Sequence, residues 1–465
     1  MRPRYLLFVA IAGAAVLLTA CGSIPPYQKP AMEIPAVFRE AHLFQPAQPN
    51  RAIPDEWWRL FGDETLNRLQ AQLVNGNENL RLAVAQYRAA LSALDASRAS
   101  LFPTVGAGLS DSRGRSPTSP RVADTISLTA SASWEVDLWG RLSAQTGSAQ
   151  ARVEASEADL ASVRLSLQAA LAQTYFALRA AEAQAALLDN TVQAYRRSLE
   201  MTQDRYRVGV VSAADVAQAQ TQLRSTQAQL VDARRSRAQL EHALAVLVGV
   251  PPSAFLLEAT AQLPSAPQVP VQLPAQLLER RPDIAAAERR VAAANSQIGA
   301  AQAAFFPSLT LSANAGYRGT SFADLVSVPN RVWALGPALA LSLFDGGSRR
   351  AAVAGAEAAF EQAAANYRQT VLTAMQEVED NLVLAATLQE RTELLSEALT
   401  EARRALEIIT NQYRAGTVSF LNVVTAQTTA LAAERTLLDA RTSYLVATNQ
   451  LLKNLAGSWE SPKNP

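Results

Sequence analysis

Apolar and polar residues alternate without a break from Thr125 to Leu138. Successive side chains of a β-strand point to opposite faces, so this pattern predicts a strand with one apolar and one hydrated face. Similar stretches predict four strands in all, over about 104–113, 125–139, 308–318 and 332–344. Because Pro337 lies inside the last of them and a proline cannot donate to a ladder, we expect a bulge or a local break there.

Alternation by itself favours strands of a soluble sandwich, but other features of these segments favour a membrane barrel. Their polar faces are rich in Ser and Thr and carry carboxylates, as a water-filled lumen would. The strands also reach the roughly 9–11 residues that a tilted membrane strand needs. Aromatic residues cluster at the strand ends, as in interfacial girdles: Trp134, Trp139, Trp333 and Phe344. Four strands cannot close a barrel and lipid does not tolerate open edges, so copies of the chain must assemble. Twelve or more strands would leave a channel.

A different pattern, apolar residues three and four positions apart, predicts long helices. No proline occurs from about Leu142 to Tyr206, and a helix of about 65 residues would span on the order of 100 Å. Sustained heptads of this kind indicate coiled-coil packing, and we expect helical hairpins over about 142–248 and 349–455. The last helix carries two heptad rows one residue apart, as in a ring where each helix has a neighbour on both sides. The alternative is a spectrin-like soluble bundle.

The chain contains two copies of one large unit. Arg205–Ser212 (Arg-Tyr-Arg-Val-Gly-Val-Val-Ser) matches Gln412–Ser419 (Gln-Tyr-Arg-Ala-Gly-Thr-Val-Ser). We therefore expect a first repeat over 61–248 and a second over 283–455, each a strand pair followed by a helical hairpin. A proline-rich segment at 249–282 is expected to form a belt between them, and 456–465 a tail. Gly209 and Gly416 lie where each hairpin turns, a position that favours a left-handed glycine.

The N-terminus resembles the leader of a bacterial lipoprotein. Arg2 and Arg4 precede an apolar run that is too short for a comfortable membrane span, and Leu18-Thr19-Ala20-Cys21 follows. We predict a signal peptide at 1–20, acylation of Cys21 and an extended, lipid-anchored arm over 21–60. Gly22 after the cysteine favours sorting to the outer membrane. The alternative is an ordinary signal peptide with a chance cysteine.

Composition excludes several classes of function. The net charge is +1, from 42 basic and 41 acidic residues, so no face tracks a nucleic-acid backbone. Cys21 is the single cysteine, and His42 and His242 share no ligand spacing. No Walker loop, Gly-x-Ser-x-Gly elbow or His-Glu-x-x-His motif occurs. We therefore expect no enzyme activity, no metal and no cofactor.

Several motifs, loose one by one, are specific in their combination and order. They are the lipobox, Trp134–Arg141, Arg280–Asp283, Phe306-Pro307, Leu343–Gly347 and the two Tyr-Arg-x-Gly tips. Together they resemble the outer membrane factor family, the TolC-like exit ducts of tripartite efflux systems, in its lipoprotein branch. The resemblance covers essentially the whole mature chain.

This resemblance implies an α+β membrane protein that assembles as a homotrimer. Three chains would form a twelve-stranded transmembrane β-barrel, continued by a helical coiled-coil barrel that is closed at the hairpin tips. A periplasmic adaptor and an inner-membrane pump would open it, and substrate would pass from the periplasm without chemistry or cofactor.

The chain departs from the family pattern at the tip. In similar ducts an acidic residue often rings the closed tip, four positions after a leucine. Here the leucine is Leu421 and the fourth position is Thr425, while Asn422 stands where the first repeat has Asp215. Asp215, in the first hairpin, is the first carboxylate after either turn. It is expected either to act in the gate or simply to favour the dipole of its own helix.

Three other functions are compatible with parts of the pattern. A periplasmic adaptor lipoprotein is also helical and lipid-anchored, but it usually has one hairpin between β-rich halves. A structural envelope coiled coil would not need Ser/Thr-rich alternating strands, and an envelope enzyme would need a catalytic site. Two hairpins with four amphipathic strands favour the duct.

Overall fold

The computed structural model describes residues 26–35, 38–43, 54–115, 122–267 and 281–455. The chain divides into two compact units. The first comprises Met1–Met32, Ala85–Ala158 and Ile284–Thr370, and the second Glu33–Val84, Asp159–Asp283 and Val371–Pro465. Each unit takes residues from both sequence repeats. The signal peptide, Cys21, the tail at 456–465 and part of the proline-rich segment lie outside the described residues.

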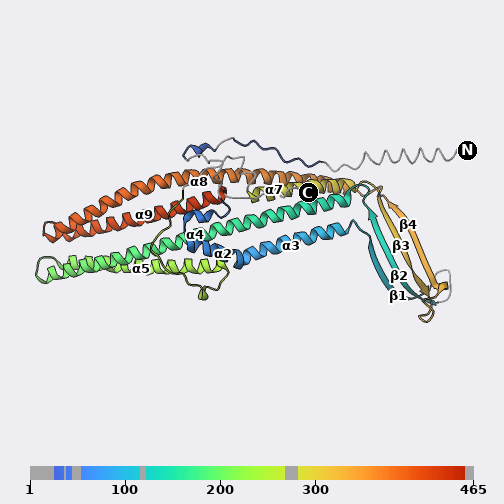
Figure 1. Cartoon of the computed structure of the whole chain (residues 1–465), viewed down its shortest axis with the longest axis horizontal. Helices are drawn as coiled ribbons and strands as arrows, with labels where there is room; N and C mark the ends of the chain where they lie inside the picture. Colours follow the sequence, from blue (N-terminus) through green and yellow to red (C-terminus); the bar gives the residue numbers. More distant parts are fainter. Residues whose placement is uncertain (1–25, 36–37, 44–53, 116–121, 268–280, 456–465) are drawn as a thin grey trace. The chain divides into compact units, whose positions relative to one another are not determined.

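The first unit contains one antiparallel sheet (Figure 1). Its strands, in spatial order, are β1 (Thr104–Arg115), β2 (Val122–Val136), β3 (Ser308–Gly319) and β4 (Arg331–Ala340). The register places apolar residues opposite apolar residues: Leu128 pairs with Leu109 on one side and with Tyr317 on the other. Ser131 likewise stands opposite Asn314. The sheet therefore has one apolar face, and an opposite face that carries polar side chains on β1, β2 and β3 and mostly small residues on β4.

The apolar face of this sheet is bare in a single chain. Val105 is 77% exposed and Leu335 76% exposed. Within the described residues, β1 and β4 each pair on one side only. A single chain therefore exposes an apolar surface and two strand edges whose backbone hydrogen-bonding groups have no neighbouring strand.

The break expected at Pro337 is wrong. β4 runs unbroken from Arg331 to Ala340, with Pro337 in register opposite Leu311. A proline is tolerated on an edge strand wherever its missing N–H would point away from the neighbouring strand. β4 is such a strand, and it also ends before the predicted position 344.

Seven α-helices make up most of the rest of the described chain. They are α2 (Glu64–Gly76), α3 (Glu78–Ala99), α4 (Arg141–Arg207), α5 (Ala213–Val248), α7 (Pro282–Ala303), α8 (Ser348–Arg414) and α9 (Phe420–Leu455). Short 3-10 turns occur at Arg39–Leu43, Trp57–Phe61, Pro252–Ala254 and Val328–Asn330. Ala, Leu, Gln, Glu and Arg, all strong helix formers, fill the long helices. Among the described residues, none of the helices is long and apolar enough to cross a membrane.

Three of these helices were not predicted: α2, α3 and α7. α3 leads into β1 and α7 leads into β3, and each has 22 residues. Each repeat is therefore a helix, a strand pair and a helical hairpin, which extends the duplication beyond the motifs that revealed it.

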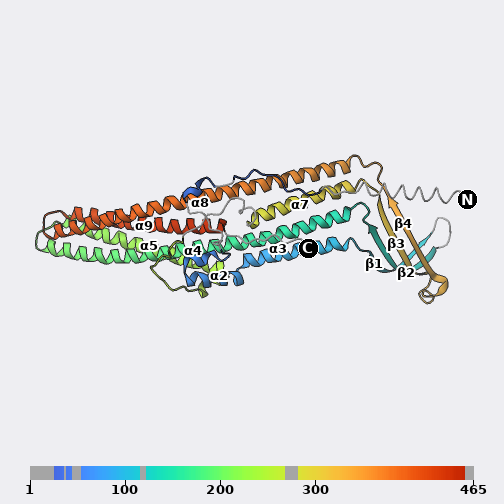
Figure 2. The same ribbon diagram turned by 45° about the horizontal axis from the view of Figure 1, so that its top comes forward.

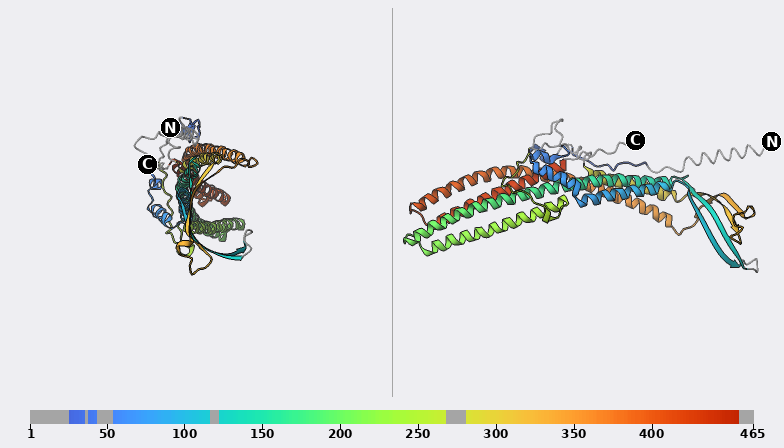
Figure 3. Two further views of the ribbon diagram at one scale, coloured as in Figure 1. Left: turned by 90° about the vertical axis from the view of Figure 1, so that its right-hand side faces the viewer. Right: turned by 60° about the horizontal axis from the view of Figure 1, so that its bottom comes forward.

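In the second unit the hairpins α4–α5 and α8–α9 run side by side (Figures 2 and 3). Apolar residues from three helices form one cluster between them: Leu188, Val192 and Tyr195 of α4, Leu223, Leu230 and Ala233 of α5, and Leu431 of α9. Trp57 is fully buried beside α9, where its indole N–H donates to Asn449 Oδ1 (3.2 Å). Large Leu and Tyr side chains pack among small Ala residues, which is the knobs-into-holes arrangement that the heptads predict.

Candidate functional site at the hairpin tips

The first tip joins α4 to α5 through a left-handed glycine. Gly209 has φ of 78°, and its N–H donates to the carbonyl of Tyr206 (2.9 Å). The next N–H, that of Val210, donates to the carbonyl of Arg205 (2.9 Å). These two bonds satisfy carbonyls that the end of the helix leaves free. The left-handed turn predicted at Gly209 is confirmed.

The second tip repeats this geometry. Gly416 also has φ of 78°, with its N–H donating to Tyr413 (3.0 Å) and that of Thr417 donating to Gln412 (3.0 Å). The prediction of a left-handed glycine holds here too. Both turns are exposed and narrow, so they present backbone and short side chains at the end of each hairpin.

Asp215 makes a capping box at the start of α5. Its carboxylate accepts hydrogen bonds from the backbone N–H and the hydroxyl of Ser212, both at 2.9 Å. In return, the Ser212 hydroxyl accepts from the Asp215 N–H (3.3 Å). The helix-start role weighed for Asp215 is therefore present in the structure. The Ser-x-x-Asp spacing was visible in the sequence and could have predicted it.

The two tips are tied together by Arg205. Its guanidinium donates from Nη1 to the carbonyl of Tyr413 (2.5 Å) and lies 4.6 Å from the centroid of the Tyr413 ring. Tyr413 also contacts Phe420, with ring centroids 5.5 Å apart, in a cluster completed by Ala219 and Val423. An end-of-helix carbonyl is a good partner for a cation because the helix dipole is negative there. Sequence analysis missed this tie, since the two residues belong to different hairpins.

The other tip residues predicted from the sequence lie at the start of α9. Leu421 is 54% exposed, and Asn422 and Thr425 are exposed as well. Thr425 donates its hydroxyl to the carbonyl of Leu421 (3.0 Å), one turn earlier on the same face. The side chains of Leu421 and Thr425 thus share an open face, while Val423 points into the cluster around Tyr413.

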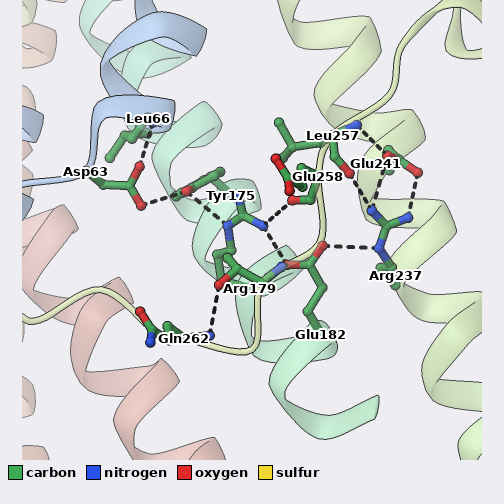
Figure 4. A network of polar contacts seen from close by, with 11 residues as sticks. Asp63, Leu66, Tyr175, Arg179, Glu182, Arg237, Glu241, Leu257, Glu258 and Gln262 are labelled. Carbon is green, nitrogen blue, oxygen red and sulfur yellow. Dashed lines mark hydrogen bonds and ion pairs between the residues drawn. The ribbon is translucent and has the colours of Figure 1, made fainter. Parts of the chain in front are cut away.

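A second polar cluster lies further along the first hairpin and is buried (Figure 4). Glu182 receives hydrogen bonds from two arginines, Arg179 (2.6 Å) and Arg237 (3.1 Å). The side chains of Arg179 and Glu182 are only 4% and 3% exposed. Arg237 also binds Glu241 (2.9 Å). This cluster, Arg179, Glu182, Arg237 and Glu241, is called the buried clamp below.

The buried clamp holds the chain that follows α5. Arg237 and Glu241 bind the carbonyl (2.7 Å) and the N–H (2.8 Å) of Leu257. Arg179 binds the carbonyl of Glu258 (3.0 Å), and Glu182 accepts from the N–H of Thr260 (3.1 Å). The clamp thereby replaces the hydrogen bonds that these backbone groups would lose on leaving water.

Tyr175 and Asp63 extend the clamp to the start of α2. The Tyr175 hydroxyl donates to Asp63 (2.6 Å) and accepts from Arg179 (3.0 Å). Burial raises the pKa of Tyr175, and the bond to Asp63 adds to the rise, so the phenol stays protonated. Burial lowers the pKa of Arg179, but its contacts with Tyr175 and Glu182 outweigh this and raise it. The Arg179 guanidinium therefore stays charged beside a protonated Tyr175 phenol over the physiological range.

Within the described residues no group of three or more His, Cys, Asp or Glu side chains is placed to hold a metal ion. Residues 69–250 and 273–457 match the family described as Outer membrane efflux protein. The chain belongs to this family.

Individual relatives agree over nearly the full length. A toluene efflux pump outer membrane protein of Pseudomonas putida is 33% identical over 464 residues, covering 97% of this chain and 95% of the relative. A pyoverdine export outer membrane protein of Pseudomonas aeruginosa is 31% identical over 467 residues, covering 98% of each. The solved structure of the outer-membrane channel OprN matches with a TM-score of 0.86 and 31% identity, over 94% of this chain and 99% of that one.

These likenesses confirm the predicted fold class, with four strands per chain continued by long helical hairpins. They also confirm the predicted family, the location in the outer membrane and the role as the outer-membrane component of an efflux system. The adaptor and structural-lipoprotein alternatives are thereby excluded. The specific roles predicted for Cys21 and for the tip residues stay predictions.

Proposed function

We propose that three copies of this efflux protein form one continuous duct, with a twelve-stranded barrel in the outer membrane and a tube of helices in the periplasm. One observation carries the proposal: the sheet exposes a whole apolar face and leaves β1 and β4 each open on one side. Lipid tolerates no open ladder edge, so β4 of one chain has to pair with β1 of the next. Three four-stranded sheets give enough strands for an open lumen.

The duct passes its substrate without changing it, and needs no cofactor. The names of two relatives support this, because toluene and pyoverdine are chemically unlike substrates. A neutral, Ser/Thr-rich lumen accommodates both kinds of molecule, since it offers small polar groups and no dedicated pocket. Choice of substrate then belongs to the inner-membrane pump that feeds the duct.

The hairpin tips form the gate and the docking surface for a periplasmic adaptor. Gly209 and Gly416 make the narrow turns, Leu421 seals the closed end, and Asn422 and Thr425 line it in place of an acidic ring. Asp215 contributes a nearby charge that its capping box already holds in place. Opening requires each chain's tips to move apart from those of its neighbours.

Cys21, which lies outside the described residues, carries the lipid anchor. Cys21→Ser should abolish acyl labelling and leave the precursor uncleaved by the lipoprotein signal peptidase. The barrel should still insert, because twelve strands anchor far more strongly than acyl chains do. A labelled and processed Cys21→Ser protein would refute the anchor.

Cysteine labelling tests the barrel. In a Cys21→Ser background, cysteines at Ser127, Thr129, Ser312 or Asn314 should react with a membrane-impermeant, water-soluble thiol reagent in the assembled protein. Cysteines at Leu128 and Leu311, on the other face of the same strands, are the matched controls and should be shielded by lipid. Equal labelling of both sets would overturn the barrel and the duct with it.

A further inference from the structure

The apolar face of the sheet becomes charged near the β1–β2 and β3–β4 connections. On β1, Arg113 and Arg115 continue the row of Val105 and Leu109, because residues two apart share a face. On β4, Arg331 continues the row of Trp333 and Leu335 in the same way, opposite Tyr317 on β3. Arg113, Arg115 and Arg331 are all exposed. They lie on the two edge strands of the sheet, which pair between neighbouring chains in the proposed barrel, and together they are called the outward arginine patch.

These arginines lie on the apolar face, which would contact lipid in a membrane barrel. A water-filled lumen would accept arginines at no cost, yet the polar face at the same end of the sheet carries mostly small residues. Ser110, Ser112 and Thr125 are examples, and Arg318 is the arginine of that face. On the outward face, aromatic rings separate the arginines from the aliphatic band, with Trp333 two residues from Arg331 and Tyr317 paired with it. This order of aliphatic, aromatic and cationic side chains is that of a surface crossing from hydrocarbon into headgroups.

We propose that the outward arginine patch binds the phosphate groups of the glycolipid in the outer leaflet of the outer membrane. The inference rests on the proposed function, because the barrel turns this face to lipid and its loop end to the cell exterior. Guanidinium groups bind phosphate bidentately, and long arginine stems reach from the edge of the hydrocarbon to the headgroup level. A phosphorylated lipid is therefore the partner whose charge and depth both match.

The neighbouring carboxylates leave the patch cationic. Arg113 lies 3.5 Å from Asp124, and Asp111 shares the same face. Arg115 and Arg331 have no acidic partner among the described residues. Three arginines against two aspartates leave an excess of positive charge on each chain, and both side chains of the Arg113–Asp124 pair remain largely open, at 76% and 49% exposed. Anionic headgroups gain from this excess at roughly 1 kcal/mol per arginine near the surface.

The test uses the full-length protein, purified as trimers and freed of lipid. Binding would be measured with lipid A that carries its phosphates and with the same lipid after phosphate removal. The wild type should bind the phosphorylated form more tightly, and the double variant Arg113→Gln/Arg331→Gln should bind it about 25-fold more weakly, from about fivefold per arginine. Arg318→Gln, on the polar face of the same sheet end, is the matched control and should leave binding unchanged.

Three results would overturn the proposal: equal binding of the two lipids, no loss in the double variant, or an equal loss in Arg318→Gln. Trimer formation is measured on the same samples, and the labelling pattern on the cysteine variants of the protein in membranes. If those remain normal while the lipid results fail, the glycolipid site is wrong and the duct stands. If the labelling pattern itself fails, the duct is wrong.

Discussion

The two helical hairpins have the same lengths and the same turns, but they hold their polar groups differently. α4 and α8 each have 67 residues, α5 and α9 each have 36, and both tip glycines have φ of 78°. Because the lengths match, every position of the first hairpin has a counterpart in the second. The counterparts of the buried clamp residues are uncharged: Ala386, Gln389, Tyr444 and Thr448.

This difference between the hairpins indicates the role of the charged clamp residues. The clamp binds the backbone of residues 257–260, which follow α5, and not the partner helix alone. Helix pairing needs only the apolar seam that both hairpins share, whereas a docked irregular segment needs its carbonyls and N–H groups satisfied. At the tips the same logic applies, since Arg205 supplies a cation to the second hairpin, while its counterpart Gln412 has no charge to give.

The largest effect is expected from breaking the clamp. Glu182→Ala would leave the buried Arg179 and the half-buried Arg237 without their shared carboxylate, a loss of about 3–5 kcal/mol of unfolding free energy. Gln389→Ala, at the matching exposed position of α8, should change stability little. Denaturant unfolding followed by helical circular dichroism measures both. Equal effects would mean that the clamp adds nothing beyond ordinary helix packing.

The next effect should be the same in both hairpins. Gly209→Val and Gly416→Val each force a β-branched residue into a left-handed turn, costing roughly 1–2 kcal/mol. An added Cβ meets nothing within 4 Å at Gly209 and only Arg205 Nη2 at 3.7 Å at Gly416, so strain and not crowding dominates. Export should fall while trimers still form, as assayed by efflux in cells and by native electrophoresis. If the Gly416→Val protein exported substrate at the wild-type rate, the proposed role of this turn would be contradicted.

A smaller effect is expected from the tie between the tips. Arg205→Gln makes the first tip like the second, and removes the bond to the Tyr413 carbonyl and the ring contact, together worth about 1 kcal/mol at this partly buried site. The closed state should loosen, which raises the single-channel conductance of the purified duct. Arg207→Gln, two residues on, is the control, because within the described residues Arg207 pairs with Asp204 of its own helix. No difference between the two variants would show that the tie does not bear on closure.

The smallest effect concerns the missing acidic ring. Multivalent cations applied from the periplasmic side should block the wild-type duct weakly, because Thr425 is neutral. Thr425→Asp should strengthen the block, since three converging carboxylates focus the field in a narrow pore. Strong block in the wild type that disappears in Asp215→Asn would move the ring to the first hairpin. Strong block that survives Asp215→Asn would show that the gate lies elsewhere.

Periodicity was enough to predict the long helices and the strand faces, because heptads and alternation are local and repeat many times. Periodicity failed where the structure depends on a single residue or on a contact between residues distant in sequence. Pro337 was expected to break its strand because position on a sheet edge is not encoded locally. The buried clamp joins three segments distant in sequence, and Arg205 meets Tyr413 across two hairpins, so neither could be found from spacing. The Asp215 capping box was the exception, since its motif lies within four residues.

The open edges of β1 and β4 also govern how the protein has to be made. A chain waiting in the aqueous periplasm offers two unpaired ladders and a bare apolar face, the combination that templates edge-to-edge aggregation. Whether a chain aggregates therefore depends on how long it stays unassembled as well as on its sequence. In the proposed trimer the sheet stays uncovered until three chains meet, so any variant that slows assembly should lose more protein to aggregation and proteolysis before insertion.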